Sequence, residues 1–213
     1  MAARAIILVG SRWHIPWEGG EILSNLLASE GFSTTRTDQG SILEPARLRD
    51  TALVVFYCEG RWDAKDPASR RLTPAQEADL VAFVENGGGF LGVHGATVFR
   101  DEYTRYPRMI GGTFVNHAKF SEFPVRILNR EHPVTQGVGD YSVQDEPYVV
   151  DRYPGSDVLL VGEWDGKDHP FGWVKGCGKG RVCYLANGHD RRSLDHPAVQ
   201  RLLRNAARWC VGI

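Results

Sequence analysis

Histidines that follow apolar or glycine-rich segments are the residues best suited to chemistry in this sequence. They are His94, His117 and His189. An imidazole can carry protons near neutral pH or ligate a metal ion. The adjacent carboxylates Asp145 and Glu146 could add a base or oxygen ligands. Three histidines that meet one of these carboxylates would form an acid–base cluster or a metal site, and the spacing does not decide between the two.

His94 is the central residue of Gly92-Val-His-Gly-Ala96, which has the layout of a strand-to-helix elbow. Small neighbours permit the sharp turn that holds the central side chain in a cleft. Hydrolases place Ser or Cys at this position. A histidine there argues against a covalent nucleophile and favours proton transfer or metal ligation. The alternative is that His94 only forms a hydrogen bond within a packed turn.

Alternating strands and helices must position these residues. Continuous apolar runs predict strands at 5–10, 52–58 and 90–93, and further strands are predicted at 125–128, 157–164 and 180–186. Helices are predicted from residue 18 to Gly31, from the capping box Thr73-Pro-Ala-Gln76 to Gly87, and from about Asp195 onward. The pattern predicts an α/β fold, a three-layer sandwich with a mostly parallel central sheet, in a single domain over residues 1–213.

In such a sheet, ligands bind beyond the carboxyl ends of the strands. This edge collects the loops that start near Ser11, Glu59, His94 and Asn187. The pair Asp145-Glu146 lies in a strand-like stretch, so the two side chains point to opposite faces and one of them can face the cleft.

Composition and net charge limit the classes of partner that this protein is expected to bind. The chain has 213 residues, 42% of them hydrophobic and 24% charged, with a net charge of −1. This balance predicts a folded protein that binds neither nucleic acid nor membranes. The first apolar run is too short for a membrane span or a secretory signal, which predicts a cytoplasmic protein. The four cysteines have no CxxC spacing and are expected to pack in the core.

Several segments resemble the ThuA-like, or trehalose utilisation, family. They are residues 80–97, 110–117, 132–137, 144–148, 170–173 and 178–189. Gln144-Asp-Glu-Pro-Tyr148, for example, is similar to the Asp-Glu-x-Tyr segment of that family. The resemblance covers most of residues 50–210 and implies the flavodoxin-like fold of class I glutamine amidotransferases. Since His94 replaces the elbow cysteine of those relatives, Cys-dependent glutamine hydrolysis is not expected.

The resemblance also implies roles for individual residues. Catalytic residues are expected at His94, His189 and Glu146. Substrate contacts are expected at His117, Trp173, Tyr148 and Asp145, since sugar rings stack on exposed aromatic faces. Any metal, such as zinc, is expected on His94, His117 and His189. Trp13-His14 only loosely resembles the histidine-bearing loop of the family, so His14 is given no role.

The family implies a small carbohydrate ligand. The leading hypothesis is a sugar isomerase, lyase or hydrolase that uses acid–base or metal-assisted chemistry on a sugar or oxidised sugar. The alternative is a non-catalytic sugar-binding or regulatory module that has lost its nucleophile. A third hypothesis is an amide hydrolase that activates water. Edge strands and aromatic loops would also suit a homo-oligomer.

Overall fold

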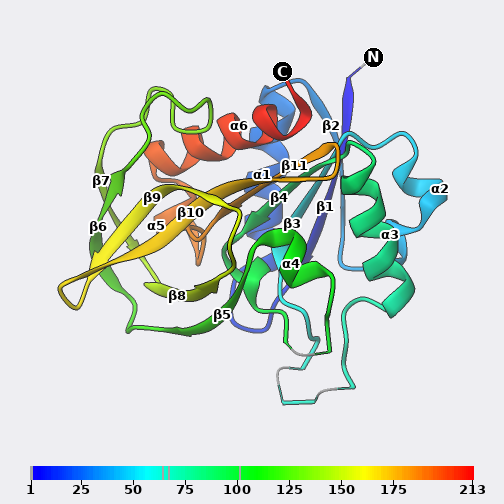
Figure 1. Ribbon diagram of the computed structural model, residues 1–213, viewed down its shortest axis with the longest axis horizontal. Helices are drawn as coiled ribbons and strands as arrows, with labels where there is room; N and C mark the ends of the chain where they lie inside the picture. The colour runs from blue at the N-terminus through cyan, green and yellow to red at the C-terminus, as the bar shows by residue number, and fades with distance from the viewer. Residues whose placement is uncertain (1, 64, 67, 101) are drawn as a thin grey trace.

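The protein is described by a computed structural model that covers residues 2–63, 65–66, 68–100 and 102–213. One large twisted sheet runs through the molecule, with helices on both of its faces (Figure 1). The strands in sheet order are β2 (Phe32–Thr37), β1 (Ala3–Gly10), β3 (Leu53–Cys58), β4 (Gly89–Val93), β11 (Gly180–Leu185), β10 (Lys167–Cys177), β9 (Asp157–Trp164), β6 (Ser121–Ile127) and β7 (Tyr141–Asp145). A separate two-stranded sheet pairs β5 (Gly112–His117) with β8 (Tyr148–Arg152).

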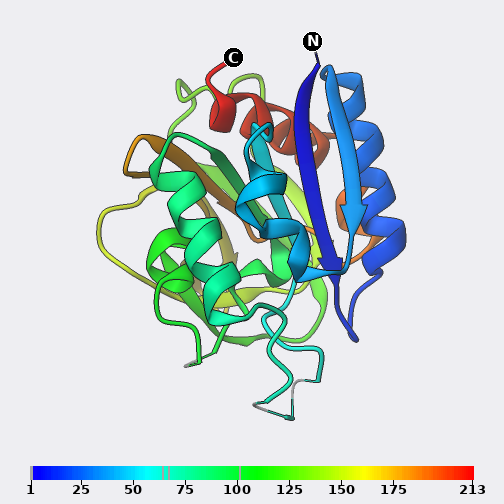
Figure 2. The same ribbon diagram turned by 90° about the vertical axis from the view of Figure 1, so that its right-hand side faces the viewer.

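The first five strands of this order are parallel and form the central part of the sheet. The helices are α1 (Pro16–Ser29), α2 (Pro45–Leu48), α3 (Pro74–Glu85), α4 (Tyr106–Ile110), α5 (Arg191–Leu194) and α6 (Pro197–Val211), with 3-10 turns η1 (Gly40–Leu43) and η2 (His94–Thr97). Figure 2 shows α1 and α3 on opposite sides of β1 and β2. Since α5 and α6 pack with α1 while α2 and α4 pack with α3, the predicted three-layer α/β sandwich is confirmed.

The apolar runs form the strands that they predict. Every residue of β3 and of β4 is buried, as expected for strands covered by helices on both faces. The predicted strands correspond to β1, β3, β4, β6, β9 and β11. The predicted helices correspond to α1, α3 and α6, and the Thr73–Gln76 capping box is present at the start of α3.

The sequence pattern is less informative for two strands, β10 and β2. Strand β10 follows β9 through the turn Asp165-Gly166, and both residues have positive φ. This combination is the signature of a tight hairpin. The edge strand β2 is polar and half-exposed, so no apolar run marks it. Among the described residues, no helix is both long and apolar enough to cross a membrane.

Candidate functional site

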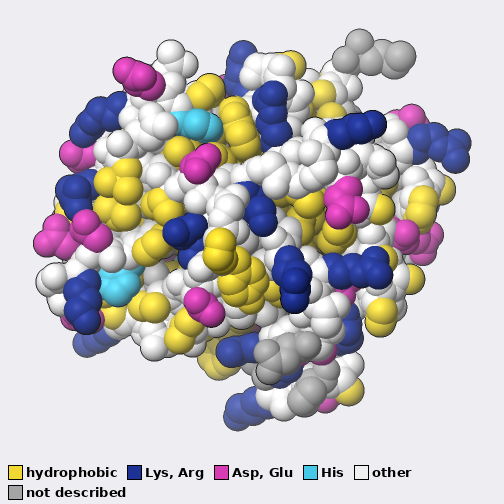
Figure 3. Space-filling view, viewed as in Figure 1, with side chains coloured by type: hydrophobic (Ala, Val, Ile, Leu, Met, Phe, Trp, Pro, Cys, Tyr) yellow, Lys and Arg dark blue, Asp and Glu magenta, His cyan; other side chains and the backbone are white. Residues whose placement is uncertain are grey.

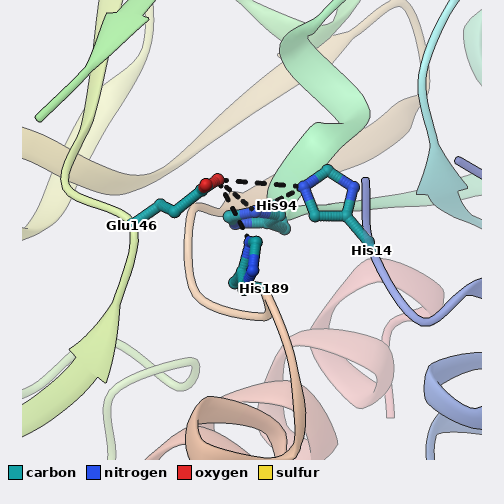
Figure 4. A group of neighbouring side chains, drawn as sticks. All are labelled: His14, His94, Glu146 and His189. Atoms are coloured by element: carbon teal, nitrogen blue, oxygen red, sulfur yellow. Dashed lines mark hydrogen bonds and ion pairs between the residues drawn. The ribbon is translucent and has the colours of Figure 1, made fainter. Parts of the chain in front are cut away.

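Four side chains from separate loops converge at the carboxyl edge of the parallel strands (Figure 4). His14 follows β1, His94 follows β4, His189 follows β11, and Glu146 lies between β7 and β8. One ligand atom from each side chain lies within 4.8 Å of all the others. We call these four residues the His3Glu cluster. Three of its members are predicted site residues, and they meet at the edge that the topology predicts.

The backbone at His94 adopts the predicted elbow. Its φ is +48°, in the left-handed region that costs a non-glycine residue about 1 kcal/mol. Two glycines make room for the turn. A Cβ on Gly92 would lie 2.7 Å from Ile110 Cδ1, and one on Gly188 would lie 3.3 Å from His94 Cβ. The small residues therefore allow β4 to end with the imidazole aimed into the cluster.

The hydrogen bonds of His94 define which of its nitrogens faces the cluster. Nδ1 donates to the carbonyl oxygen of Ala186 at 2.8 Å, so Nδ1 carries the proton. Nε2 lies 3.1 Å from His14 Nε2 and 3.4 Å from Glu146 Oε2. Burial lowers the pKa of His94, and the neighbouring His14 lowers it further. A neutral His94 therefore presents the lone pair of Nε2 to the cluster.

His14 is held from behind by two polar side chains. Its Nδ1 lies 2.7 Å from Ser11 Oγ and 3.1 Å from Glu59 Oε1. Ser11 Oγ in turn donates to Glu59 Oε1 at 2.5 Å. Burial would lower the pKa of His14, but the carboxylates of Glu146 and Glu59 outweigh this and raise it to about 9. Nδ1 is thus committed to this support, and Nε2 points at the cluster.

Glu146 is the common neighbour of the histidines. Its Oε2 lies 3.2 Å from His189 Nδ1 and 3.8 Å from His14 Nε2. Burial would raise the pKa of the Glu146 carboxyl, but its contacts with the imidazoles of His14, His189 and His94 hold it far below its usual range. Glu146 is therefore ionised. His189 Nδ1 is buried and has no hydrogen bond of acceptable geometry to any described residue.

Asp145 is the last residue of β7 and does not belong to the cluster; its Oδ1 lies 3.9 Å from Nδ1 of His94, the nitrogen that faces away from the cluster. Asp145 is fully buried, and its oxygens accept the backbone N–H groups of Glu146 (2.8 Å), Gly188 (2.8 Å) and His189 (3.2 Å). The predicted substrate contact at Asp145 is therefore wrong, because the side chain is enclosed by backbone donors. Asp145 instead ties the Glu146 loop to the His189 loop.

A cavity of about 520 Å³ opens over the cluster. It is lined by Trp13, His14, Glu59, Val98, Arg100, Phe114, His117, Glu146, Tyr148 and His189. Tyr148 places its ring 4.3 Å from that of His94, so this predicted contact residue forms part of the wall. Trp13 is 68% exposed and offers a free aromatic face. The mixture of aromatic and ionisable groups is typical of a small-ligand site.

Two further predicted site residues do not belong to the His3Glu cluster. Trp173 is fully buried, and its Nε1 donates to the carbonyl of Ile110 at 2.8 Å, so the predicted sugar contact at Trp173 is wrong. His117 lines the cavity, but its Nδ1 lies 3.7 Å from Glu146 Oε1 and 2.9 Å from the carbonyl of Ala118. His14 takes the place that was predicted for His117 in the set of converging ligands.

The comparisons with known proteins agree with this architecture. A family model described as ThuA, trehalose utilisation, matches residues 4–210. The chain belongs to the ThuA family. The resemblance of its segments to that family is thereby confirmed. A comparison with curated proteins finds no match.

Solved structures share the ThuA fold. A ThuA-like protein from Parabacteroides merdae has 18% identity and a TM-score of 0.81, with 99% of this chain and 90% of that chain covered. A second, from Bacteroides uniformis, has 21% identity and a TM-score of 0.79 over 98% and 91% of the chains. A glutamine amidotransferase from Thermotoga maritima covers all of both chains at 12% identity and a TM-score of 0.68. The predicted glutamine amidotransferase-like fold is therefore confirmed.

No thiol takes over the role of the amidotransferase nucleophile at the elbow of this ThuA protein. Cys58 ends the neighbouring strand β3, but it is buried, and burial raises the pKa of its thiol to about 12. A buried neutral thiol is a poor nucleophile. The chemistry of the site therefore depends on imidazole and carboxylate groups.

The donor set of the ThuA site fits a divalent cation such as zinc. Three imidazole nitrogens and one carboxylate oxygen are ligands that zinc accepts, and ligands at about 2.1 Å in tetrahedral geometry lie about 3.4 Å apart. Four of the six separations among the cluster atoms are 3.1, 3.2, 3.4 and 3.8 Å, and all six are within 4.8 Å. Moreover, Nδ1 of His94 and of His14 bind outer oxygen partners, which is how metal-ligating histidines are commonly oriented.

Proposed function

We propose that this ThuA-family protein is a metal-assisted enzyme that acts on a sugar derivative, with the His3Glu cluster holding a divalent cation such as zinc. The observation that carries the proposal is the convergence of three imidazoles and a carboxylate beside a ligand-sized cavity. His189 Nδ1 supports it, because this buried atom lies 3.2 Å from Glu146 Oε2 without the geometry of a hydrogen bond, as two ligands of one metal would.

The walls of the cavity support a carbohydrate ligand. Trp13, Phe114 and Tyr148 present aromatic surface. The apolar C–H face of a sugar ring packs on such surfaces, while charged and polar groups at the rim bind its hydroxyls. The family description, trehalose utilisation, agrees with this ligand class.

The reaction that fits these groups best is isomerisation or elimination next to a carbonyl of an oxidised sugar. A bound divalent cation supplies a Lewis acid that polarises the oxygen of such a substrate. His94 and His14 hold their Nε2 atoms toward the cluster, since their Nδ1 atoms are engaged by Ala186 and Ser11. His117 is half-exposed on the cavity wall, beside Glu146. We assign to His117 the transfer of a proton between the substrate and the solvent.

Metal content tests the proposal. The protein purified without a histidine tag should contain about one divalent metal per chain by inductively coupled plasma mass spectrometry. His94→Ala and His189→Ala should lose this metal while keeping the circular dichroism spectrum of the wild type. His117→Ala should retain it, because His117 lies outside the cluster. As a matched control, His132→Ala removes a histidine that packs on Trp209 of α6 and should also retain the metal.

The outcome also separates the competing functions. A wild-type protein that stays metal-free after dialysis against zinc would overturn the metal assignment. Turnover of oxidised sugars by that metal-free protein would show that the reaction uses acid–base catalysis without a metal. Saturable sugar binding without any product would instead favour a non-catalytic module, as the replacement of the elbow nucleophile by His94 allows. Ammonia release from simple amides would identify an amide hydrolase.

A further inference from the structure

A second and larger cavity adjoins the one above the cluster. Its volume is about 970 Å³, and it lies among α4, β5, β8, β10 and the loop after η2. Arg100 and Phe114 line both cavities, so they form the boundary between them. The ring of Tyr148 lies 4.3 Å from that of His94 and 4.6 Å from that of Phe114. Phe114 at the boundary is thus connected to His94 of the cluster through the ring of Tyr148. This separation is short enough for a substituent on a sugar over the cluster to enter the second cavity.

Positive charge dominates the lining of this second cavity. Arg100, Arg108 and Lys175 contribute three cations, against one carboxylate from Asp151. Lys175 Nζ donates to the carbonyl of Arg108 at 2.8 Å, which fixes the ammonium at the wall. In Figure 3, Lys and Arg side chains stand around an apolar patch on the face that carries α4.

The two arginines differ from many others on this surface. Arg126, Arg130 and Arg192, for instance, each form an ion pair with an aspartate. Among the described residues, neither Arg100 nor Arg108 has a carboxylate partner within ion-pair distance. Such guanidinium groups bind phosphates and carboxylates through paired hydrogen bonds.

We infer that the second cavity binds an anionic group, a phosphate or a carboxylate, that the sugar substrate carries. The inference rests on the proposed function for the position of the sugar ring, which lies over the cluster. Arg100 at the boundary and Arg108 elsewhere on the wall, both exposed, bind the anion, while Lys175 adds charge. Thr113 and Tyr153, whose hydroxyls lie 2.7 Å apart on the same wall, offer neutral donors.

Binding of three matched probes tests this inference. Isothermal titration calorimetry of the wild-type protein compares glucose 6-phosphate, glucuronate and glucose. At least one anionic sugar should bind about tenfold more tightly than glucose, the effect expected of one charge-assisted hydrogen bond. The preference should shrink as salt is added. The tighter of the two anionic probes identifies the group as phosphate or carboxylate. Equal affinity for all three, or no saturable binding of either anion, would overturn the inference.

Variants locate the anion. Arg108→Met and Arg100→Met should each remove most of the preference for the anionic sugar. Lys179→Met removes a cation on the exposed turn after β10, outside both cavities, and should leave the preference unchanged. An anion preference that survives both arginine substitutions would place the anion elsewhere and overturn the inference.

The same titration in His94→Ala separates this inference from the proposed function. That variant alters the cluster and leaves the second cavity intact, so the anion preference should survive in it. If the wild type holds no metal and yields no product but still prefers the anion, only the proposed function fails. If the metal is bound and the anion preference is absent, only the present inference fails.

Discussion

The two edges of the parallel sheet are built on opposite principles. At the carboxyl edge, ionisable side chains crowd together, with His94 and Asp145 fully buried. At the amino edge, glycines press against the backbone of helix ends. A Cβ on Gly180 would lie 2.1 Å from the carbonyl oxygen of Val84, and one on Gly89 would lie 2.8 Å from that of Cys210.

The difference shows which edge of the sheet contains features that lower the stability of the fold. Buried charges and a left-handed histidine cost free energy, and such features collect at functional sites. Close backbone packing of these glycines contributes stability at the other edge, and the cavity of about 500 Å³ that lies there has no histidine among the described residues that line it. Substitutions at the amino edge should therefore change stability alone, whereas substitutions around the cluster should change ligand binding.

The largest effect on stability is expected from Gly180→Ala. The added methyl group meets backbone atoms of Val84 and Gly88, which cannot rotate away, and should lower the free energy of unfolding by about 3 kcal/mol. Urea unfolding followed by circular dichroism measures this loss. Gly176→Ala is the matched control on β10, since a Cβ there meets nothing within 4 Å. Folded Gly180→Ala should keep its full metal content, and a loss of metal from the folded protein would blur the contrast between the edges.

A smaller but specific effect is expected from Glu59→Gln at the carboxyl edge. Glu59 supports Nδ1 of His14 together with Ser11, and hydrogen bonding with both lowers the pKa of this buried carboxyl although burial raises it. Replacing the carboxylate with a neutral amide of the same shape should weaken metal binding about tenfold to a hundredfold, which is the usual effect of mutating a residue that hydrogen-bonds to a metal ligand. Competition with a fluorescent zinc chelator measures the affinity.

The matched control for Glu59→Gln is Glu85→Gln at the exposed end of α3. This substitution removes a carboxylate at the amino edge of the sheet, opposite the cluster, and should leave zinc affinity unchanged. Equal zinc affinity for Glu59→Gln and the wild type would show that the support of His14 does not contribute to metal binding.

Local sequence patterns predict the parallel strands and the residues that directly follow them better than the rest of the site. Apolar runs identify β1, β3 and β4 because helices cover both of their faces, and the end of β4 leads to His94. The strand predicted at 180–186, observed as β11, leads to His189. Strand alternation also predicts that only one of Asp145 and Glu146 faces the site, although β7 ends at Asp145 and Glu146 lies beyond it. These predictions need only the periodicity of the backbone.

The remaining site residues depend on contacts that no local pattern encodes. His14 enters the cluster through the path of the loop after β1. The side chains that support it are distant in sequence, since Ser11 and Glu59, which form a hydrogen bond, are 48 positions apart. Trp173 is buried because its face of β10 is covered: its Nε1 donates to the carbonyl of Ile110 at the end of α4, and its ring lies 4.4 Å from that of Tyr184. A tryptophan in a strand looks the same in sequence whether its sheet position is interior or exposed. Trp13, which lies in a loop, lines the cavity instead.

The smallest effect is expected from Thr73→Ala, which lies before α3 and serves the fold alone. Thr73 Oγ accepts the N–H of Gln76 at 3.2 Å, and Gln76 Oε1 accepts the N–H of Thr73 at 3.0 Å. Loss of the hydroxyl should lower the free energy of unfolding by about 1 kcal/mol, the usual effect of an N-cap. Urea unfolding measures it, with Ser142→Ala on the exposed face of β7 as the control. Because the cap touches no cluster residue, metal content should stay at the wild-type value, and a fall in metal content would mean that α3 supports the cluster as well as the fold.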